Sequence, residues 1–169
     1  MKEAIIESRE EQPIVRWKKI LAPTDFSERS QAAVRTATCL AEQCGAKITL
    51  LHVIQLPVSG CPEAELAVDE VINSSSDSLN EIASGVPTAL LDEKIVRPNT
   101  QGIEREIIET ARHISADLIV VAMHDCSPFT RALLGSTTEY LIRHAPCTVL
   151  VTRQNHGAEP TVSDRTNKL

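Results

Sequence analysis

The chain alternates short apolar segments with segments of helical periodicity, and this alternation restricts the fold more than any other feature. The apolar run 48–54 (ITLLHVI) is almost continuous, as expected of a strand covered on both faces. The segments between such runs repeat apolar residues three and four positions apart. The predicted strands are 18–23, 48–54, 93–96, 117–122 and 147–152, with helices starting near 28, 64, 101 and 136. This order predicts an α/β fold with a parallel sheet and helices on both faces.

Residues at the ends of the predicted helices indicate where each begins or stops. Asp25 or Ser27 can cap the first helix, and Gly45 stands where that helix should end. The serine run 74–76 weakens the middle of the second helical pattern. Asn99 or Thr100 can cap the third helix. The third strand is more polar than the others, so we expect it near an edge of the sheet.

Composition indicates one globular domain, residues 17–153, between a flexible N-terminal arm (1–16) and a loose C-terminal tail (154–169). Aromatic residues make up only 2% of the 169 residues, which leaves no row of rings for base stacking. A net charge of -6 argues against a general nucleic-acid binder. The chain contains no apolar stretch of roughly 18 residues, so we expect no membrane association.

The cysteines and the N-terminal residues indicate the compartment. The five cysteines are odd in number and scattered, so they predict reduced thiols rather than a disulfide framework. The first residues (MKEAIIESREEQPIVRW) lack the apolar run of a signal peptide. We therefore expect a cytoplasmic protein.

The stretch 117–153 carries the strongest functional signal. A short strand, a loop and then Gly135-Ser136-Thr137-Thr138-Glu139 precede a helix. Free N–H groups at the start of a helix, together with the helix dipole, suit an anion such as phosphate. The same residues also fit a capping box of Ser136 and Glu139, which needs no ligand. Both interpretations stay open at this point.

Four segments, in order, match one known family: KKILAPTDFS, AKITLLHVI, ADLIVVAMH and LLGSTTEYLIRHAPCTVLVTR. On these segments the chain resembles the universal stress protein family over residues 17–153. The resemblance implies an open, Rossmann-like sheet of order 3-2-1-4-5, similar to the adenine nucleotide alpha hydrolases. It also implies a homodimer that pairs through the fifth strand, 147–152. Residues after Pro23 and after Ala122 should then flank one crevice.

Some members of this family bind ATP through a Gly-x2-Gly-x9-Gly-Ser/Thr motif, whose positions fall here on Ala122, Asp125, Gly135 and Ser136. The last two match the motif and the first two do not. The family's adenine-side positions fall on Pro23, Thr24, Asp25 and Val53 and are intact. The candidate cofactor-binding residues are Pro23, Thr24, Asp25, Val53, Ala122, Met123, His124, Asp125, Gly135, Ser136, Thr137 and Thr138.

Two departures from the motif weaken the predicted nucleotide site. Ala122 adds a methyl group near the ribose position. A carboxylate of Asp125 at ~4 Å from a phosphate would cost on the order of several kcal/mol, unless Mg²⁺ bridges the two groups. Pro128 and Phe129 make the loop stiffer and bulkier. Asp25 has two possible roles, a nucleotide contact or an N-terminal helix cap, and we favour the cap.

Three other kinds of site are weaker. His124, Asp125 and Ser136 have the residue types of a hydrolytic triad, but adjacent His and Asp rarely orient one another. His124, Cys126, His144 and Cys147 superficially suggest zinc, although Cys147 is expected to be a small buried side chain. Cys126 is the best candidate for a reactive thiol, and we favour an incidental loop cysteine.

The sequence thus predicts a non-enzymatic universal stress protein acting as a regulatory or adaptor module. It has a degenerate nucleotide site, no catalytic or metal residues, no required cofactor and an unknown protein partner. The alternative is a nucleotide sensor that binds ATP or AMP with Mg²⁺, either with or without slow hydrolysis of ATP.

Overall fold

A computed structural model describes residues 17–55, 62–123 and 135–153. The predicted arm 1–16 and tail 154–169 lie outside these ranges. Within them, strands and helices alternate as predicted. Their bounds are β1 Lys19–Pro23, α1 Glu28–Cys44, β2 Lys47–Ile54, α2 Pro62–Ser84, β3 Leu91–Pro98, α3 Ile103–His113, β4 Leu118–Ala122, α4 Ser136–His144 and β5 Thr148–Thr152.

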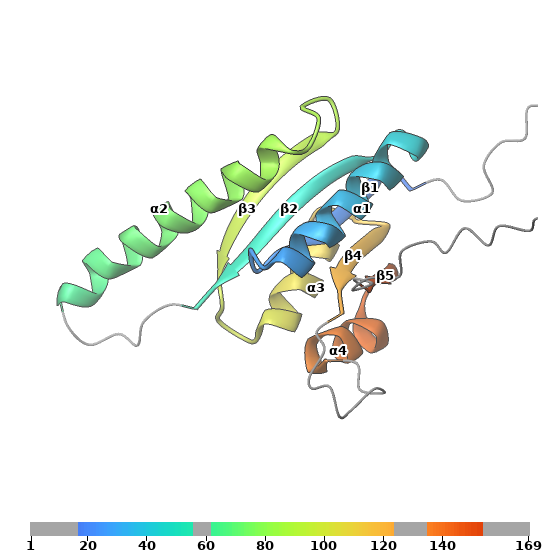
Figure 1. The fold of residues 1–169 in the computed structure, drawn as a ribbon. Helices are drawn as coiled ribbons and strands as arrows, with labels where there is room; N and C mark the ends of the chain where they lie inside the picture. Colours follow the sequence, from blue (N-terminus) through green and yellow to red (C-terminus); the bar gives the residue numbers. More distant parts are fainter. Residues whose placement is uncertain (1–16, 56–61, 124–134, 154–169) are drawn as a thin grey trace, which may run out of the picture.

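The strands form one parallel sheet in the order β3-β2-β1-β4-β5 (Figure 1). Every strand pair is parallel, and the centre of the sheet is β1, which pairs with β2 on one side and β4 on the other. The predicted fold class and the strand order implied by the resemblance are both confirmed. The predicted edge position of β3 is confirmed as well.

Apolar side chains fill the space on both faces of the sheet. Along β1, Ile20 and Ala22 belong to one buried cluster and Leu21 to the other, because successive strand side chains point to opposite faces. Residues of α1 and α2 complete the first cluster, and residues of α3 and α4 complete the second. The sheet is therefore a middle layer between two pairs of helices (Figure 1).

The predicted ends of the first helix are confirmed, and the serine run does not interrupt the second. Ser27 is the N-cap of α1 and accepts a hydrogen bond from the Ser30 amide, while Gly45 closes the helix in the left-handed conformation at φ 68°. The helix α2 runs without a break through residues 74–76. There, Ser76 donates its hydroxyl to the Ile72 carbonyl at 2.7 Å, as mid-helix serines commonly do.

Two boundaries around α3 differ from the prediction. The strand β3 extends over Leu91–Pro98, beyond the predicted 93–96, because the β2 ladder continues beside it. Neither Asn99 nor Thr100 caps α3, since Gly102 is the N-cap and the helix start has no side-chain cap hydrogen bond. The Asn99 side chain instead accepts from the Gly102 amide at 2.8 Å, and Thr100 contacts Glu106.

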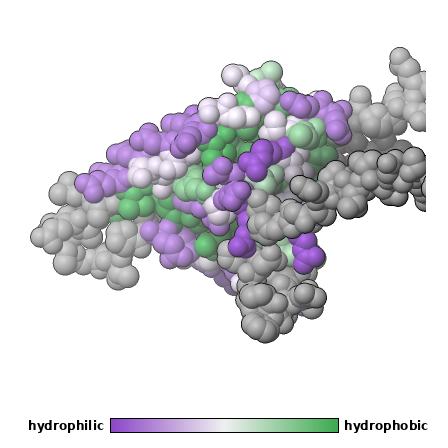
Figure 2. Space-filling view, viewed as in Figure 1, coloured by the Kyte–Doolittle hydropathy of each residue, from purple (hydrophilic) through white to green (hydrophobic). Residues whose placement is uncertain are grey.

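Hydrophilic residues cover much of the outer surface, and apolar residues show between α1 and α2 (Figure 2). A shallow groove of about 690 Å³ runs there, lined by both helices. Among the helices of the described ranges, none combines the length and the apolar character needed to cross a bilayer.

Candidate functional site

The strand order reverses at β1, and this point creates a crevice at the carboxyl ends of β1 and β4. From β1 the chain continues into α1 on one face, whereas α4, which follows β4 in the chain, packs on the other face. Two segments that leave adjacent parallel strands toward opposite faces open a gap between them. The predicted crevice after Pro23 and Ala122 is therefore present.

A cavity of about 320 Å³ occupies this crevice, which is large enough for a small organic ligand. Its walls come from β1 and the start of α1, from the end of β2, from α3, from the end of β4 and from the first turn of α4. The lining residues are Pro23, Thr24, Asp25, Ser27, Arg29, Ser30, Leu51, His52, Val53, Ile103, Ile107, Val121, Ala122, Thr137 and Thr138.

Hydrogen bonds fix the wall between β1 and α1. The Thr24 amide donates to the Leu51 carbonyl at 2.8 Å, and the Thr24 and Ser30 hydroxyls lie 3.0 Å apart. The Asp25 carboxylate accepts from the amide and the hydroxyl of Ser27, at 3.0 and 2.5 Å. The turn places Phe26 at a φ of 66°, a conformation that the hydrogen bonds on either side support. The polar groups of this wall therefore find partners without a ligand.

Asp25 is exposed at the mouth of the cavity. Partial burial raises the pKa of the Asp25 carboxyl, but hydrogen bonds from Ser27 and Ser30 outweigh burial and hold the pKa below its usual value. The carboxylate is therefore negatively charged at neutral pH. Since Ser27 is the N-cap, Asp25 supports the start of α1 and lines the cavity at the same time.

The opposite wall is apolar and belongs to α3. Ile107 is 3% exposed and Ile103 is 36% exposed, so Ile103 offers an accessible apolar surface beside the cavity. At the end of β2, Leu51 is fully buried and Val53 is partly buried. His52 lies between the walls, with Nδ1 2.8 Å from the Thr24 carbonyl and its ring centroid 4.0 Å from that of Phe26. These surfaces suit a flat, uncharged ring.

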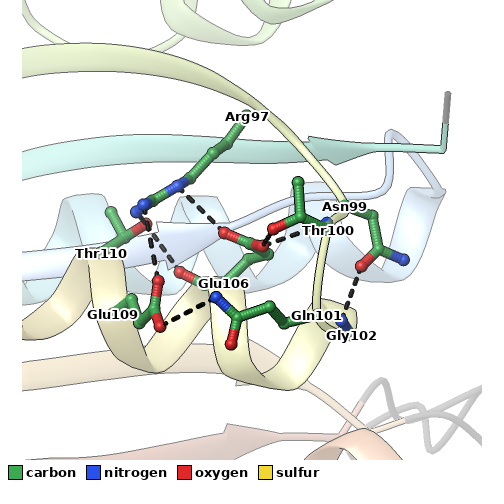
Figure 3. A network of polar contacts seen from close by, with 8 residues as sticks. All are labelled: Arg97, Asn99, Thr100, Gln101, Gly102, Glu106, Glu109 and Thr110. Atoms are coloured by element: carbon green, nitrogen blue, oxygen red, sulfur yellow. Dashed lines mark hydrogen bonds and ion pairs between the residues drawn. The ribbon is translucent and has the colours of Figure 1, made fainter.

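A polar network holds the start of α3 in place (Figure 3). Its centre is Glu106, which is 2% exposed although it is charged. Its carboxylate accepts from the Thr100 hydroxyl at 2.6 Å and the Thr100 amide at 3.1 Å, and it contacts Arg97 Nε at 3.0 Å. Arg97 also donates to the Thr110 hydroxyl at 3.1 Å. The network ties the turn 99–102 to α3, which carries Ile103 and Ile107.

The Thr100 hydrogen bonds are the largest cause of a lowered pKa at Glu106, and the positive charge of Arg97 adds to them, while burial opposes both.

The sequence interpretation missed this network. A signal was available, because Glu106 falls on the apolar stripe of its helix, beside Ile103 and Ile107. A carboxylate on a buried stripe requires a partner.

The capping box predicted at the start of α4 is wrong. Gly135 is the N-cap, no side chain caps the helix, and Ser136 is already its first residue. Glu139 turns outward and pairs with Arg143 at 2.7 Å. The first hydrogen bond of the helix runs from the Glu139 amide to the Gly135 carbonyl. Within the described residues, the amides of 136–138 therefore receive no side-chain acceptor from a cap.

The structure brings together seven of the twelve predicted site residues. Pro23, Thr24, Asp25, Val53, Ala122, Thr137 and Thr138 line the cavity. Met123, Gly135 and Ser136 are described but do not line it. His124 and Asp125 lie outside the described residues, as do Cys126, Pro128 and Phe129. The charge argument about Asp125 therefore stays a prediction.

Arg29 is the lining residue whose environment is least expected. It is the second residue of α1, and its Nη1 is shielded from solvent without a hydrogen-bond partner among the described residues. The sequence interpretation missed it, although a basic residue in the first turn of a helix opposes the helix dipole and could have been noticed.

Of the residues considered for zinc, His144 and Cys147 are described and do not line the cavity. His144 Nδ1 lies 2.9 Å from the Tyr140 carbonyl, and its ring stacks on Tyr140. Cys147 is half-buried rather than buried as predicted, because it lies just before β5 at the end of the sheet. Within the ranges that the structure describes, no three His, Cys, Asp or Glu side chains gather to suit a metal ion.

Comparison with known proteins agrees with the fold. A sequence model of the universal stress protein family matches residues 16–153. The universal stress protein MJ0531 of Methanocaldococcus jannaschii is 30% identical over 146 residues, which cover 82% of this chain and 83% of that protein.

Two solved structures show the same similarity. The universal stress protein UspA from Lactobacillus plantarum superposes with a TM-score of 0.65 at 27% identity, covering 82% of this chain and 99% of that chain. A universal stress protein solved in complex with cAMP superposes with a TM-score of 0.63 at 23% identity, covering 82% of this chain and 98% of that chain. At 23% identity, this second similarity concerns the fold alone.

Proposed function

Because the chain belongs to the universal stress protein family, we propose that it is a regulatory stress-response protein that binds an adenine nucleotide in this cavity without catalysing a reaction on it. The observation that carries the proposal is that a single cavity is lined by Pro23, Thr24, Asp25 and Val53 and also by the first turn of α4. Such a cavity offers an apolar slot for a base and a helix start for a phosphate.

The end of β2 supplies backbone groups that can recognise the edge of a base. Pairing between β1 and β2 ends at Pro23 and Leu51, while β2 continues to Ile54. The Leu51 carbonyl faces β1, since it accepts from the Thr24 amide, and in a strand the backbone groups two residues further on face the same side. The N–H and C=O of Val53 therefore point toward the cavity side, beyond the end of β1. The Val53 N–H can donate to an adenine ring nitrogen, and the Val53 C=O can accept from the neighbouring adenine amino group.

The first turn of α4 supports the phosphate half of the proposal. Thr137 and Thr138 line the cavity, and no side chain in the described part of the chain caps the helix start at Gly135. Amides at an uncapped helix start favour an anion, and the helix dipole adds to this preference. A complex of a similarly folded protein with cAMP agrees with an adenine nucleotide as the ligand class.

The proposed lack of catalysis is supported by the way the hydroxyl groups at the start of α1 are engaged. Thr24 pairs with Ser30, Ser27 donates to Asp25, and Ser30 also donates to the Ser27 carbonyl. His52 directs Nδ1 to a backbone carbonyl rather than to one of these hydroxyls. A hydroxyl paired with a histidine base, one arrangement by which hydrolysis proceeds through transfer to a side chain, is not assembled on this wall.

A second candidate function is an adaptor that binds no nucleotide, and one observation favours it. Ala122, where nucleotide-binding members of the family have glycine, lines the cavity. Its methyl group takes up part of the space in which a ribose would lie.

Calorimetric titration with AMP and with ATP, each with and without Mg²⁺, separates the two functions. We expect AMP to bind with a Kd below about 1 mM. The absence of heat for both ligands at several times that concentration would leave the adaptor function. Release of phosphate from ATP over many hours, above that of a buffer control, would contradict the absence of catalysis.

Two variants at one position locate the binding site. Ala122→Gly removes the methyl group and should tighten AMP binding, whereas Ala122→Leu fills the cavity and should abolish it. Ala32→Leu is the matched control, because Ala32 lies on α1 away from the cavity lining. Equal affinities for all three variants would place the nucleotide elsewhere on the protein.

We also propose a homodimer that forms through β5 and acts in the cytoplasm with a protein partner. Within the described residues, β5 pairs with β4 alone, so its other edge offers free backbone groups to a second copy. Light scattering coupled to size exclusion tests the dimer, and a monomeric mass across micromolar concentrations would contradict it. The compartment and the partner stay predictions from the sequence.

A further inference from the structure

Arg29 stands out in the cavity because its charge has no counterpart among the described residues. The side chain belongs to the second residue of α1 and lines the cavity. Its Nη1 is shielded from solvent and has no hydrogen-bond partner among the described residues. The ion pairs of the described residues join Arg97 and Arg143 to glutamates, and none involves Arg29.

This arrangement costs free energy in the unliganded protein in two ways. A buried donor without a partner loses its hydrogen bonds to water and gains none in return. In addition, a cation in the first turn of a helix faces the positive end of the helix dipole. An arginine near a helix start avoids the first cost when its side chain extends into solvent, whereas Arg29 is only partly exposed.

Asp25, a carboxylate that lines the same cavity, is already engaged. Asp25 accepts two hydrogen bonds from Ser27, and these bonds hold its carboxylate toward the α1 cap. The hydroxyls of Thr24 and Ser30 pair with one another. These four polar side chains are thus satisfied without Arg29, and its shielded Nη1 has no partner among the described residues.

The first turn of α4, which also lines the cavity, favours the same kind of ligand as Arg29. Thr137 and Thr138 belong to the uncapped first turn of α4, on the opposite face of the sheet from α1. A guanidinium on one wall and a helix start on the other both attract an anion, and guanidinium binds phosphate oxygens in a planar, two-pronged fashion.

We propose that Arg29 is a specificity residue of this site, whose guanidinium binds a phosphate of the nucleotide and selects a phosphorylated ligand over the free nucleoside. The inference rests on the proposed function and deepens it by naming the group that recognises charge. Because adenosine presents the same base and ribose without a phosphate, it isolates the contribution of Arg29.

The test is calorimetric titration of the full chain with adenosine, AMP and ATP, for the wild type and for Arg29→Gln, Arg29→Lys and Arg35→Gln. Arg35 is the matched control, because it is an exposed arginine on the same helix that does not line this cavity. Arg29→Gln should weaken AMP and ATP binding by about 10- to 100-fold and leave adenosine within about twofold. Arg29→Lys, which keeps the charge but has a single ammonium group, should give an intermediate loss.

Thermal unfolding without nucleotide provides an independent readout of folding. Arg29→Gln should unfold at the same temperature as the wild type or higher, since it removes an unpaired charge. A clear loss of stability would show that Arg29 is structural and would overturn the inference.

The remaining outcomes are distinguishable. Equal weakening of adenosine and AMP, or no change in either, would overturn the role of Arg29 while the proposed nucleotide binding stands. Loss of AMP binding in Arg35→Gln as large as that in Arg29→Gln would assign the effect to net charge and would also overturn it. A wild type that binds none of the three ligands would refute the proposed function itself, and the inference with it.

Discussion

Replacement of Glu106 by glutamine tests whether the buried network at α3 stabilises the wall of the cavity. Glutamine has nearly the same shape and keeps one oxygen that can accept from Thr100. It presents an amide N–H₂ group to Arg97, however, so the 3.0 Å contact between Arg97 Nε and the carboxylate is lost. The two hydrogen bonds from Thr100, at 2.6 and 3.1 Å, also change from charged to neutral.

These contacts set the size of the effect. A hydrogen bond to a charged group contributes about 1.5–3 kcal/mol, against about 1 kcal/mol for a neutral one. Since the Arg97 side chain is 36% exposed, water replaces part of its lost interaction. We therefore expect Glu106→Gln to lower the free energy of unfolding by about 2–3 kcal/mol, which in a chain of this length corresponds to a melting temperature lower by about 4–12 °C.

Urea unfolding followed by circular dichroism near neutral pH measures this change. Glu109→Gln is the matched control, because Glu109 contacts the same arginine at 3.6 Å but is 40% exposed. The control should cost less than about 0.5 kcal/mol. If both variants lose the same stability, or if Glu106→Gln loses less than the control, the reasoning from burial is wrong.

The same comparison predicts a dependence on pH. The pKa of Glu106 is lowered in the folded protein, chiefly by the Thr100 hydrogen bonds. Its contribution to stability is therefore fully present above the ordinary glutamate pKa of 4.5 and is lost as the pH falls below that value toward the lowered folded pKa. The difference between wild type and Glu106→Gln should shrink in acid. A difference that stays constant down to the acid transition would contradict an ionised Glu106.

Three further predictions concern single side chains. Ser27→Ala removes the cap of α1 and should lower the free energy of unfolding by about 1 kcal/mol in urea titrations, whereas Ser74→Ala, on the exposed side of α2, should not lower it. Gly45→Ala places a methyl group at φ 68° and should cost about 1 kcal/mol, although no atom lies within 4 Å of the new carbon. Burial raises the pKa of the Cys147 thiol, so mass spectrometry should find it alkylated more slowly than the exposed Cys39, and equal rates would contradict this.

The elements of the fold were predictable because their signals are local. The apolar run of β2 and the three- and four-residue spacing of α1 follow directly from which faces are buried. The start and end of α1 were predictable for the same reason, since Ser27 and Gly45 act on neighbouring backbone groups. The order of the strands came from the resemblance to a family, because a local pattern does not contain it.

Residues predicted from the resemblance meet at one cavity, and the polar chemistry around them was predicted only in part. Pro23, Asp25 and Val53 line the cavity as expected from the resemblance. The capping box failed because serine, glutamate and a helix start are compatible with two arrangements, and Glu139 pairs with Arg143 instead of turning back toward Ser136. Only the arrangement of the whole helix end in space distinguishes the two.

From its residues the chain specifies an α/β sheet with helices on both faces, because periodicity and capping depend on neighbours a few positions apart. The tertiary fold settles which polar groups find partners. It brings Thr100 and Arg97 to the buried carboxylate of Glu106 and leaves Arg29 in the cavity without a counter-ion among the described residues. Burial and pairing depend on segments that are distant in the sequence and meet only in the folded chain, so local signals mark Glu106 and Arg29 as unusual without showing which of the two finds a partner.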